Sequence, residues 1–259
     1  MGQIAYDAAT GEMMEAFSMT DEAWGIACQA PSGAILMPRT GSPAVPKVSF
    51  RGLRFFAHHP GCPDKLPAPE SYAHTRLKID IARTLRRLGF KAKVEASGQT
   101  SDGEQWIADV LAETIAGQRF AFEIQFSTQH VIDFRRRTTR YRRSGVVGCW
   151  FMPERPVASR LEKALIHENL DYYREHGEFV SDCEEIIAFT LDLTGKDTYP
   201  EELPLVRFSR GSNIQRLPLP VALAGMMGGA PRWEKPFGDG RQRDESMRCT
   251  GVSQKRARE

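Results

Sequence analysis

One segment, residues 106–126, constrains the fold more than any other part of this chain. In its second half every other residue is large and apolar: Phe120, Phe122, Ile124 and Phe126. A period of two is typical of a β-strand with one face in a core. The first half is also mostly apolar, and a short turn containing Gly117 separates the halves, so the segment predicts a β-hairpin.

Two acids lie on the arms of this hairpin, Asp109 on the first and Glu123 on the second. With the turn centred on Gly117, residue 109 lies opposite Gln125, and all three polar side chains share one face. Diagonal neighbours across an antiparallel pair are roughly 7 Å apart, close enough for two carboxylates to hold one cation. A slip of one residue would put the acids on opposite faces. The metal-site hypothesis therefore depends on the register.

The composition is that of an ordinary soluble globular protein. The 259 residues, 41% hydrophobic and 26% charged with a net charge of +2, allow one large or two small domains. No apolar run approaches the roughly 20 residues of a membrane span, and no signal-peptide pattern is present. The five cysteines include no Cys-x-x-Cys pair. An odd, scattered set favours a reduced, cytoplasmic chain.

Three regions follow from the patterning. Residues 1–62 hold short, Gly- and Pro-punctuated strands and predict a small β-rich module, and the four prolines of residues 60–69 predict a linker. The main domain, residues 63–200, alternates helices and strands. A strand, a helix and a strand in succession predict a parallel pair. Residues 201–259 are rich in Gly, Pro and charge, and predict a basic, largely disordered tail. The predicted elements of the main domain are helices over 70–88, 128–143 and 159–175, and strands over 90–96, 106–112, 119–126, 146–152 and 186–193.

The helix over residues 70–88 carries an apolar stripe formed by Leu77, Ile81, Leu85 and Leu88. His74 and Glu70 fall on the same stripe, one and two turns nearer the start of the helix. The helix face that packs on the sheet is thus ionisable at its N-terminal end. The alternative for Glu70 is a simple charge that complements the helix dipole.

The helix over residues 128–143 carries six arginines, which fit phosphate contacts because guanidinium groups fork onto phosphate oxygens. The alternative is a solvated helix surface. For Arg137, together with Tyr141, a further alternative is a structural role against the active-site strand. The six arginines of this helix are Arg135, Arg136, Arg137, Arg140, Arg142 and Arg143. The basic tail of the chain would add salt-sensitive affinity for nucleic acid.

Six short pieces of the chain, taken together, resemble the competence protein CoiA family, a branch of the PD-(D/E)xK nuclease-like superfamily. They are Phe56-Ala-His58, Glu70-Ser71-x-x-His74-x-x-x-Lys78, Ala108-Asp109-Val110, Phe122-Glu123-Ile-Gln125-x-Ser127, Arg137-x-x-x-Tyr141 and Trp150. The resemblance implies an α+β fold with a restriction-endonuclease-like αβββαβ core. It also implies metal ligands at Asp109 and Glu123, with Gln125 where most of the superfamily has lysine, and supporting roles for Glu70 and His74.

One departure concerns the small zinc-binding element that members of that family often have before the nuclease core. Cys28 has no cysteine three residues later, and Phe55 stands where a histidine would be. A structural zinc needs four closed ligands, so zinc is not expected. The alternative is a site rebuilt from Cys28, His58, His59 and Cys62.

These observations favour a Mg²⁺-dependent deoxyribonuclease for DNA processing or recombination, with Mn²⁺ as the alternative cation. Asp109 and Glu123 would hold the metal, Gln125 would position water, and Glu70 and His74 would complete the site. A second hypothesis is a catalytically weak module that positions DNA for recombination or DNA-uptake partners, because glutamine cannot carry charge. A third is a protein-interaction scaffold.

Overall fold

The computed structural model describes residues 2–62, 70–177, 186–193, 198–210, 213–229, 232–233 and 249–250. The chain divides into two compact units between Ile79 and Asp80. This division falls inside one continuous helix, α2 (Tyr72–Arg87), rather than at the predicted linker after residue 62.

The N-terminal part, residues 2–62, contains the predicted β-structure and one helix that the patterning did not predict. Thr20 caps this helix, since its side chain accepts a hydrogen bond from the backbone N–H of Ala23. Trp24 of the helix packs against Phe56 in a small core. The elements are β1 (Ile4–Asp7), β2 (Met13–Glu15), α1 (Asp21–Gln29), β3 (Ile35–Leu36), β4 (Ala44–Val48) and β5 (Arg54–His58).

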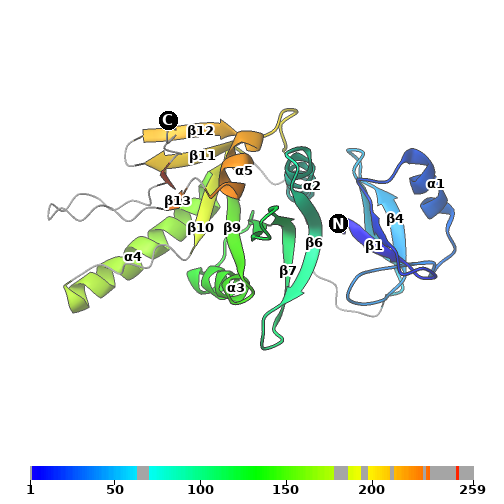
Figure 1. Cartoon of the computed structure of the whole chain (residues 1–259), viewed down its shortest axis with the longest axis horizontal. Coiled ribbons are helices and arrows are strands. Elements are labelled where there is room, and N and C mark those ends of the chain that lie inside the picture. Colours follow the sequence, from blue (N-terminus) through cyan, green and yellow to red (C-terminus); the bar gives the residue numbers. More distant parts are fainter. Residues whose placement is uncertain are drawn as a thin grey trace. The chain divides into compact units, whose positions relative to one another are not determined.

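The second part is built on a seven-stranded mixed sheet with the order β12-β11-β10-β9-β8-β7-β6 (Figure 1). Its strands are β6 (Lys91–Gln99), β7 (Gln105–Glu113), β8 (Arg119–Ile124), β9 (Val146–Pro153), β10 (Ile187–Leu191), β11 (Leu205–Arg210) and β12 (Asn213–Pro218). Besides α2, its helices are α3 (Val131–Arg143), η1 (Glu154–Ala158), α4 (Ser159–His176) and α5 (Leu219–Met227); β13 (Arg232–Trp233) and β14 (Cys249–Thr250) form a separate pair.

The strand directions follow the connections. Short turns join β6, β7 and β8, which are antiparallel. Helix α3 connects β8 to β9, and this pair is parallel, as predicted from the strand–helix–strand order. The succession α2-β6-β7-β8-α3-β9 confirms the αβββαβ order and the α+β class.

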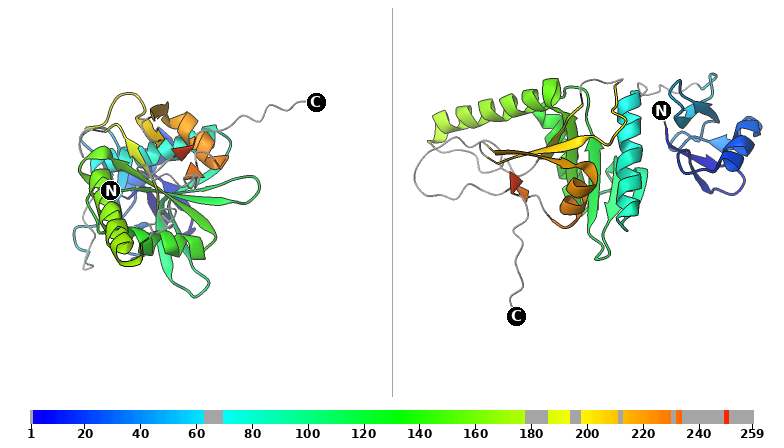
Figure 2. Two further views of the ribbon diagram at one scale, coloured as in Figure 1. Left: turned by 90° about the vertical axis from the view of Figure 1, so that its left-hand side faces the viewer. Right: turned by 90° about the horizontal axis from the view of Figure 1, so that it is seen from above.

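The core lies on both faces of the sheet. Trp150 of β9 is fully buried and packs edge-on against Phe134 of α3. Its neighbour Phe151 points to the opposite face, because side chains alternate along a strand. There it stacks with Phe122 of β8 and packs against Phe189 of β10. Figure 2 shows the distal half of α4 extending past the strands.

The predicted tail begins too early. Residues 205–210 and 213–218 are strands β11 and β12 of the main sheet, and residues 219–227 form α5. This helix is apolar on most sides, with Leu219, Leu223 and Met226 buried. Within the described residues, Pro218 and Pro220 lie where β12 meets α5, and Gly228 and Gly229 follow α5, so this Gly and Pro content does not mark a tail. Most of residues 230–259 lie outside the described part. Among the described residues, no helix is both long enough and apolar enough to span a membrane.

Candidate metal centre

The register of the β7–β8 hairpin differs from the predicted one. Val110 pairs with Phe122, and Glu113 pairs with Arg119. Extending this register by one pair places Asp109 opposite Glu123, not opposite Gln125. The prediction was wrong by two residues, because the turn is a loop closed by Thr114 and Gln118 rather than a turn centred on Gly117. A slip of two, unlike a slip of one, keeps every side chain on its predicted face.

Asp109 lies where the pairing of β7 with β8 ends. Its Oδ2 accepts a hydrogen bond from the backbone N–H of Ile124 at 2.9 Å. The carboxylate thus takes up a backbone donor of the neighbouring strand and is fixed at the end of the hairpin ladder.

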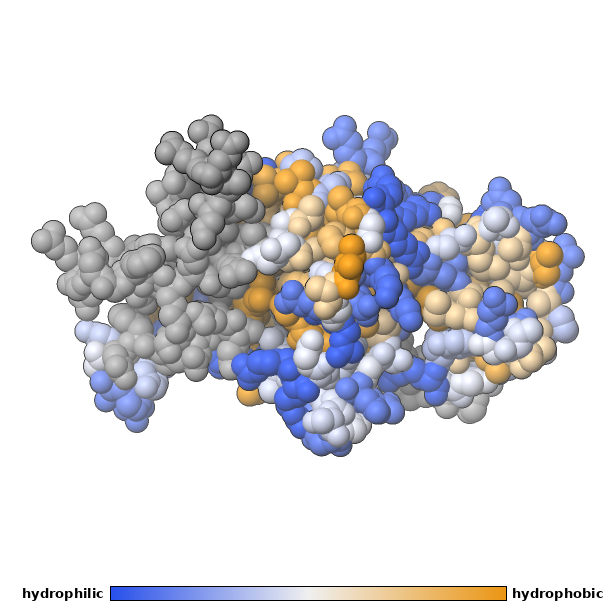
Figure 3. All heavy atoms as spheres, in the orientation of Figure 1, coloured by the Kyte–Doolittle hydropathy of each residue, from blue (hydrophilic) through white to orange (hydrophobic). Residues whose placement is uncertain are grey.

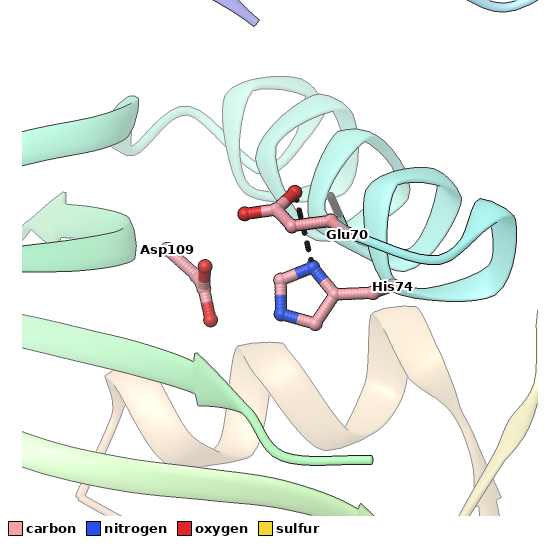
Figure 4. Close-up of side chains that lie close together, drawn as sticks. All are labelled: Glu70, His74 and Asp109. Atoms are coloured by element: carbon pink, nitrogen blue, oxygen red, sulfur yellow. Dashed lines mark ion pairs between the residues drawn. The ribbon is translucent and has the colours of Figure 1, made fainter. Parts of the chain in front are cut away.

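Glu70, His74 and Asp109 converge in a group that we call the metal group (Figure 4). One ligand atom from each lies within 4.8 Å of the other two. Glu70 lies two residues before α2, His74 lies in the first turn of α2, and Asp109 comes from β7. Nδ1 of His74 lies 3.3 Å from Oε2 of Glu70. Among the described residues, no other group of three or more His, Cys, Asp and Glu side chains comes this close.

Lys78 holds the Glu70 carboxylate of the metal group. Its Nζ lies 2.7 and 2.8 Å from the two carboxylate oxygens, and the hydroxyl of Thr75 donates to Oε2 at 3.4 Å. Lys78 is part of one of the family motifs, but no role was predicted for it. The sequence contained a sign of this contact, because Glu70, His74 and Lys78 follow one another at four-residue steps, the spacing of residues on one face of a helix.

Glu123 lies outside the metal group and is almost fully buried, with 1% of its surface exposed. The hydroxyl of Tyr141 donates to Oε1, and the guanidinium of Arg137 donates to Oε2. Burial, followed by the negative charge of Asp109, raises the pKa of Glu123 to about 7, against the opposing effect of Arg137 and Tyr141. Asp109 and Glu123 thus affect each other electrostatically, while metal binding by Glu123 stays a prediction.

Gln125 is buried, and both ends of its side-chain amide have partners. Its Nε2 donates to the carbonyl and hydroxyl oxygens of Ser127 at 2.7 and 2.9 Å, and its Oε1 accepts from Gln129. These bonds fix the segment between β8 and α3. Its predicted role in positioning water stays a prediction.

At least five of the six arginines of α3 form ion pairs with acids of this chain. Arg137 pairs with Glu123, and Arg136 pairs with Asp133. Few acids are close to these arginines in the sequence, and most of the partners come from other elements. The other pairs are Arg135 with Glu168, Arg140 with Glu104, and Arg143 with Asp102 and Glu104. Figure 3 shows hydrophilic side chains gathered over α3. DNA contact by these residues, Arg142 included, stays a prediction.

The four residues of the alternative zinc site do not converge. Nε2 of His58 lies 3.3 Å from the Thr40 hydroxyl, and the Cys62 thiol donates to the Ser42 hydroxyl at 3.4 Å. Cys28 is an exposed free thiol. Within the described residues these side chains do not meet in a group of metal-ligand spacing.

Comparison with known proteins agrees with the fold and the motifs. Residues 70–177 match the model of the nuclease-like domain of the competence protein CoiA. Over these residues the chain is similar to a CoiA nuclease-like domain. The match covers α2 to α4 and so includes the whole metal group, Glu123 and the arginines of α3.

Two further comparisons add less. No curated protein matches the chain. A solved structure described as "Crystal Structure of Protein of Unknown Function AF1548" is similar at 17% identity with a TM-score of 0.29, over 48% of this chain. The chain spans 61% of the length of that structure.

Proposed function

We propose that this chain is a divalent-metal-dependent DNA nuclease of the CoiA-like type, in which Glu70, His74 and Asp109 hold the cation. The observation that carries the proposal is the convergence of these three side chains from β7, the first turn of α2 and the segment just before α2. Ligand atoms about 2.1 Å from a Mg²⁺ ion are at most about 4.2 Å apart. The ligand atoms of Glu70, His74 and Asp109 lie within 4.8 Å of one another, so small side-chain adjustments would bring them to this distance.

The ligand set fits a divalent cation of intermediate softness. Two carboxylates suit Mg²⁺ and Mn²⁺, whereas an imidazole suits the later transition metals. We therefore expect Mn²⁺ to bind more tightly than Mg²⁺. When bound, such a cation activates water and stabilises the charge that develops on a phosphodiester. The protein's part is to hold Asp109 through Ile124 and Glu70 through Lys78, so that the ligands stay in place.

Glu123 and Gln125 have secondary roles in this proposal. To become a metal ligand, the Glu123 carboxylate has to give up its hydrogen bond with Tyr141 or Arg137. If it keeps both partners, Glu123 influences the site only through its electrostatic interaction with Asp109. Gln125 fixes the backbone that follows β8 through Ser127. DNA as substrate, and a place in DNA processing or recombination, rest on the CoiA domain and on the arginines of α3.

A second candidate is a DNA-binding module that cuts slowly or not at all. Two observations favour it. The Gln125 amide is hydrogen-bonded at both ends, to Ser127 and to Gln129. The Glu123 carboxylate is engaged by Arg137 and Tyr141. If neither side chain leaves its partners, the chemistry rests on the metal group alone.

A cleavage assay separates the two candidates. The full chain is incubated with single-stranded, duplex and branched DNA in Mg²⁺ or Mn²⁺, and binding is measured by gel shift. The nuclease proposal expects cleavage that Asp109→Asn lowers at least about 100-fold. Asp171→Asn, at an exposed acid on α4, is the matched control and keeps full activity. Wild-type cleavage by Asp109→Asn would contradict the proposal, and binding without cleavage would favour the second candidate.

A further inference from the structure

Lys78 is a lysine with no exposed surface, which is rare in proteins. Taking an ammonium out of water costs several kcal/mol unless it is paired and hydrogen-bonded. Its partner is Glu70, and both carboxylate oxygens lie within 2.8 Å of Nζ. The Lys78–Glu70 pair therefore differs from exposed ion pairs such as Arg136 with Asp133 and Arg174 with Asp171.

The helix explains why this pair meets the metal group. Residues four apart lie one above the other on a helix, so Lys78 stands one turn beyond His74 on the same face. Glu70 precedes α2, and its carboxylate contacts His74, Thr75 and Lys78 of the helix. The carboxylate is thus held by three residues of the first two turns of α2.

We infer that Lys78 is a positioning residue for the metal group. It fixes the Glu70 carboxylate beside His74 and Asp109, and it is not itself a ligand because an ammonium has no lone pair. Groups that hold metal ligands in place typically contribute 10- to 100-fold to metal affinity. This inference rests on the proposed function, because it takes Glu70, His74 and Asp109 as the cation site.

Calorimetric titration of Mn²⁺ into the full chain tests the inference without relying on cleavage. We expect Lys78→Met to weaken Mn²⁺ binding 10- to 100-fold. Lys91→Met is the matched control, because Lys91 also pairs with a glutamate, Glu113, but is 83% exposed and lies away from the metal group on β6. Its Mn²⁺ affinity should equal that of the wild type.

A double-mutant cycle shows whether Lys78 acts through Glu70. In a Glu70→Gln background, adding Lys78→Met should change Mn²⁺ affinity less than about twofold, since the carboxylate that Lys78 positions is gone. This double variant also removes both charges of the pair together, so it serves if Lys78→Met alone does not fold. A further loss of about tenfold in the double variant would overturn the inference.

The failure of the inference is distinguishable from failure of the proposed function. If wild type and Asp109→Asn bind Mn²⁺ equally, the metal group is not the site and the proposed function fails. If Asp109→Asn abolishes binding while Lys78→Met binds as tightly as wild type, the metal group stands and the role of Lys78 is refuted.

Discussion

Tyr141 and Glu123 meet in the interior of the nuclease-like domain, where the tyrosine hydroxyl of α3 donates a hydrogen bond to Oε1 of the glutamate on β8. The same hydroxyl lies 3.0 Å from the carbonyl oxygen of Ile107 on β7. One side chain of α3 therefore contacts both arms of the hairpin that carries Asp109. Arg137, one turn earlier, binds the other oxygen of Glu123. These contacts favour the structural alternative for Arg137 and Tyr141.

Glu123 should make stability depend on pH in the absence of metal. Its pKa rises from the ordinary 4.5 to about 7 because of burial. Between these values the folded protein keeps a proton that the unfolded chain has lost, so the free energy of unfolding falls as pH rises through this window. The fall is on the order of 3 kcal/mol. Urea unfolding in EDTA, from pH 4.5 to above the raised pKa of about 7, measures it.

The control for this pH dependence is Glu123→Gln, which cannot titrate. Only the slopes of stability against pH are compared, because the amide replaces a carboxylate beside Arg137 and Tyr141 and so changes the stability at every pH. A wild-type slope that persists in the glutamine variant would show that another group is responsible.

Arg137→Met should destabilise the domain, because it leaves the Glu123 carboxylate buried without its cation. At a pH of about 8 we expect a loss of about 3 kcal/mol, and a smaller loss at a pH of about 5, where Glu123 is protonated. The loss of the cation–π contact with Trp150, at 4.6 Å from the ring centroid, adds to it at both pH values. Arg136→Met is the matched control, since Arg136 is exposed and pairs with Asp133 on the surface. It should change stability by less than about 0.5 kcal/mol.

The fold was largely predictable because its signals are local. The alternation of Phe120, Phe122 and Ile124 and the helical stripe of Leu77, Ile81 and Leu85 identified elements whose apolar side chains are buried in the structure. Leu88 was placed on that stripe but is partly exposed beyond the end of α2. Helix α1 was missed because it is short and its signals, Thr20 followed by two acids, were not used.

The site was predictable only in part, because partners far apart in sequence decide it. Glu70, His74 and Asp109 were all named, since a resemblance and a shared helix face pointed to them. That Glu123 bonds to Arg137 and Tyr141 depends on how α3 packs on β8, and no periodicity contains this information. The ion pairs of the α3 arginines with Glu104 and Glu168 are likewise tertiary contacts.

The arginines of α3 allow a test of DNA contact that accounts for their ion pairs. If Arg136 contacts a phosphate, Arg136→Met should weaken DNA binding and reduce the slope of log affinity against log salt by about 0.7 to 0.9. Asp133→Asn should do the opposite and strengthen binding, because it frees Arg136 from its partner. Binding at several salt concentrations, measured by fluorescence anisotropy, checks both. Unchanged slopes in both variants would exclude Arg136 from the interface.

Gly98 and Trp106 give a prediction about packing next to Tyr141. The two residues are directly paired between β6 and β7, and a Cβ at Gly98 would lie 2.2 Å from the indole ring. In Gly98→Ala the ring must move and lose its hydrogen bond to the Ser144 hydroxyl at 2.8 Å and its edge contact with Tyr141. We expect a loss of about 1–3 kcal/mol in urea unfolding. In a Trp106→Leu background the same substitution should cost much less, because the clash is absent. An equal cost in both backgrounds would show that the glycine is required for a reason other than the indole ring.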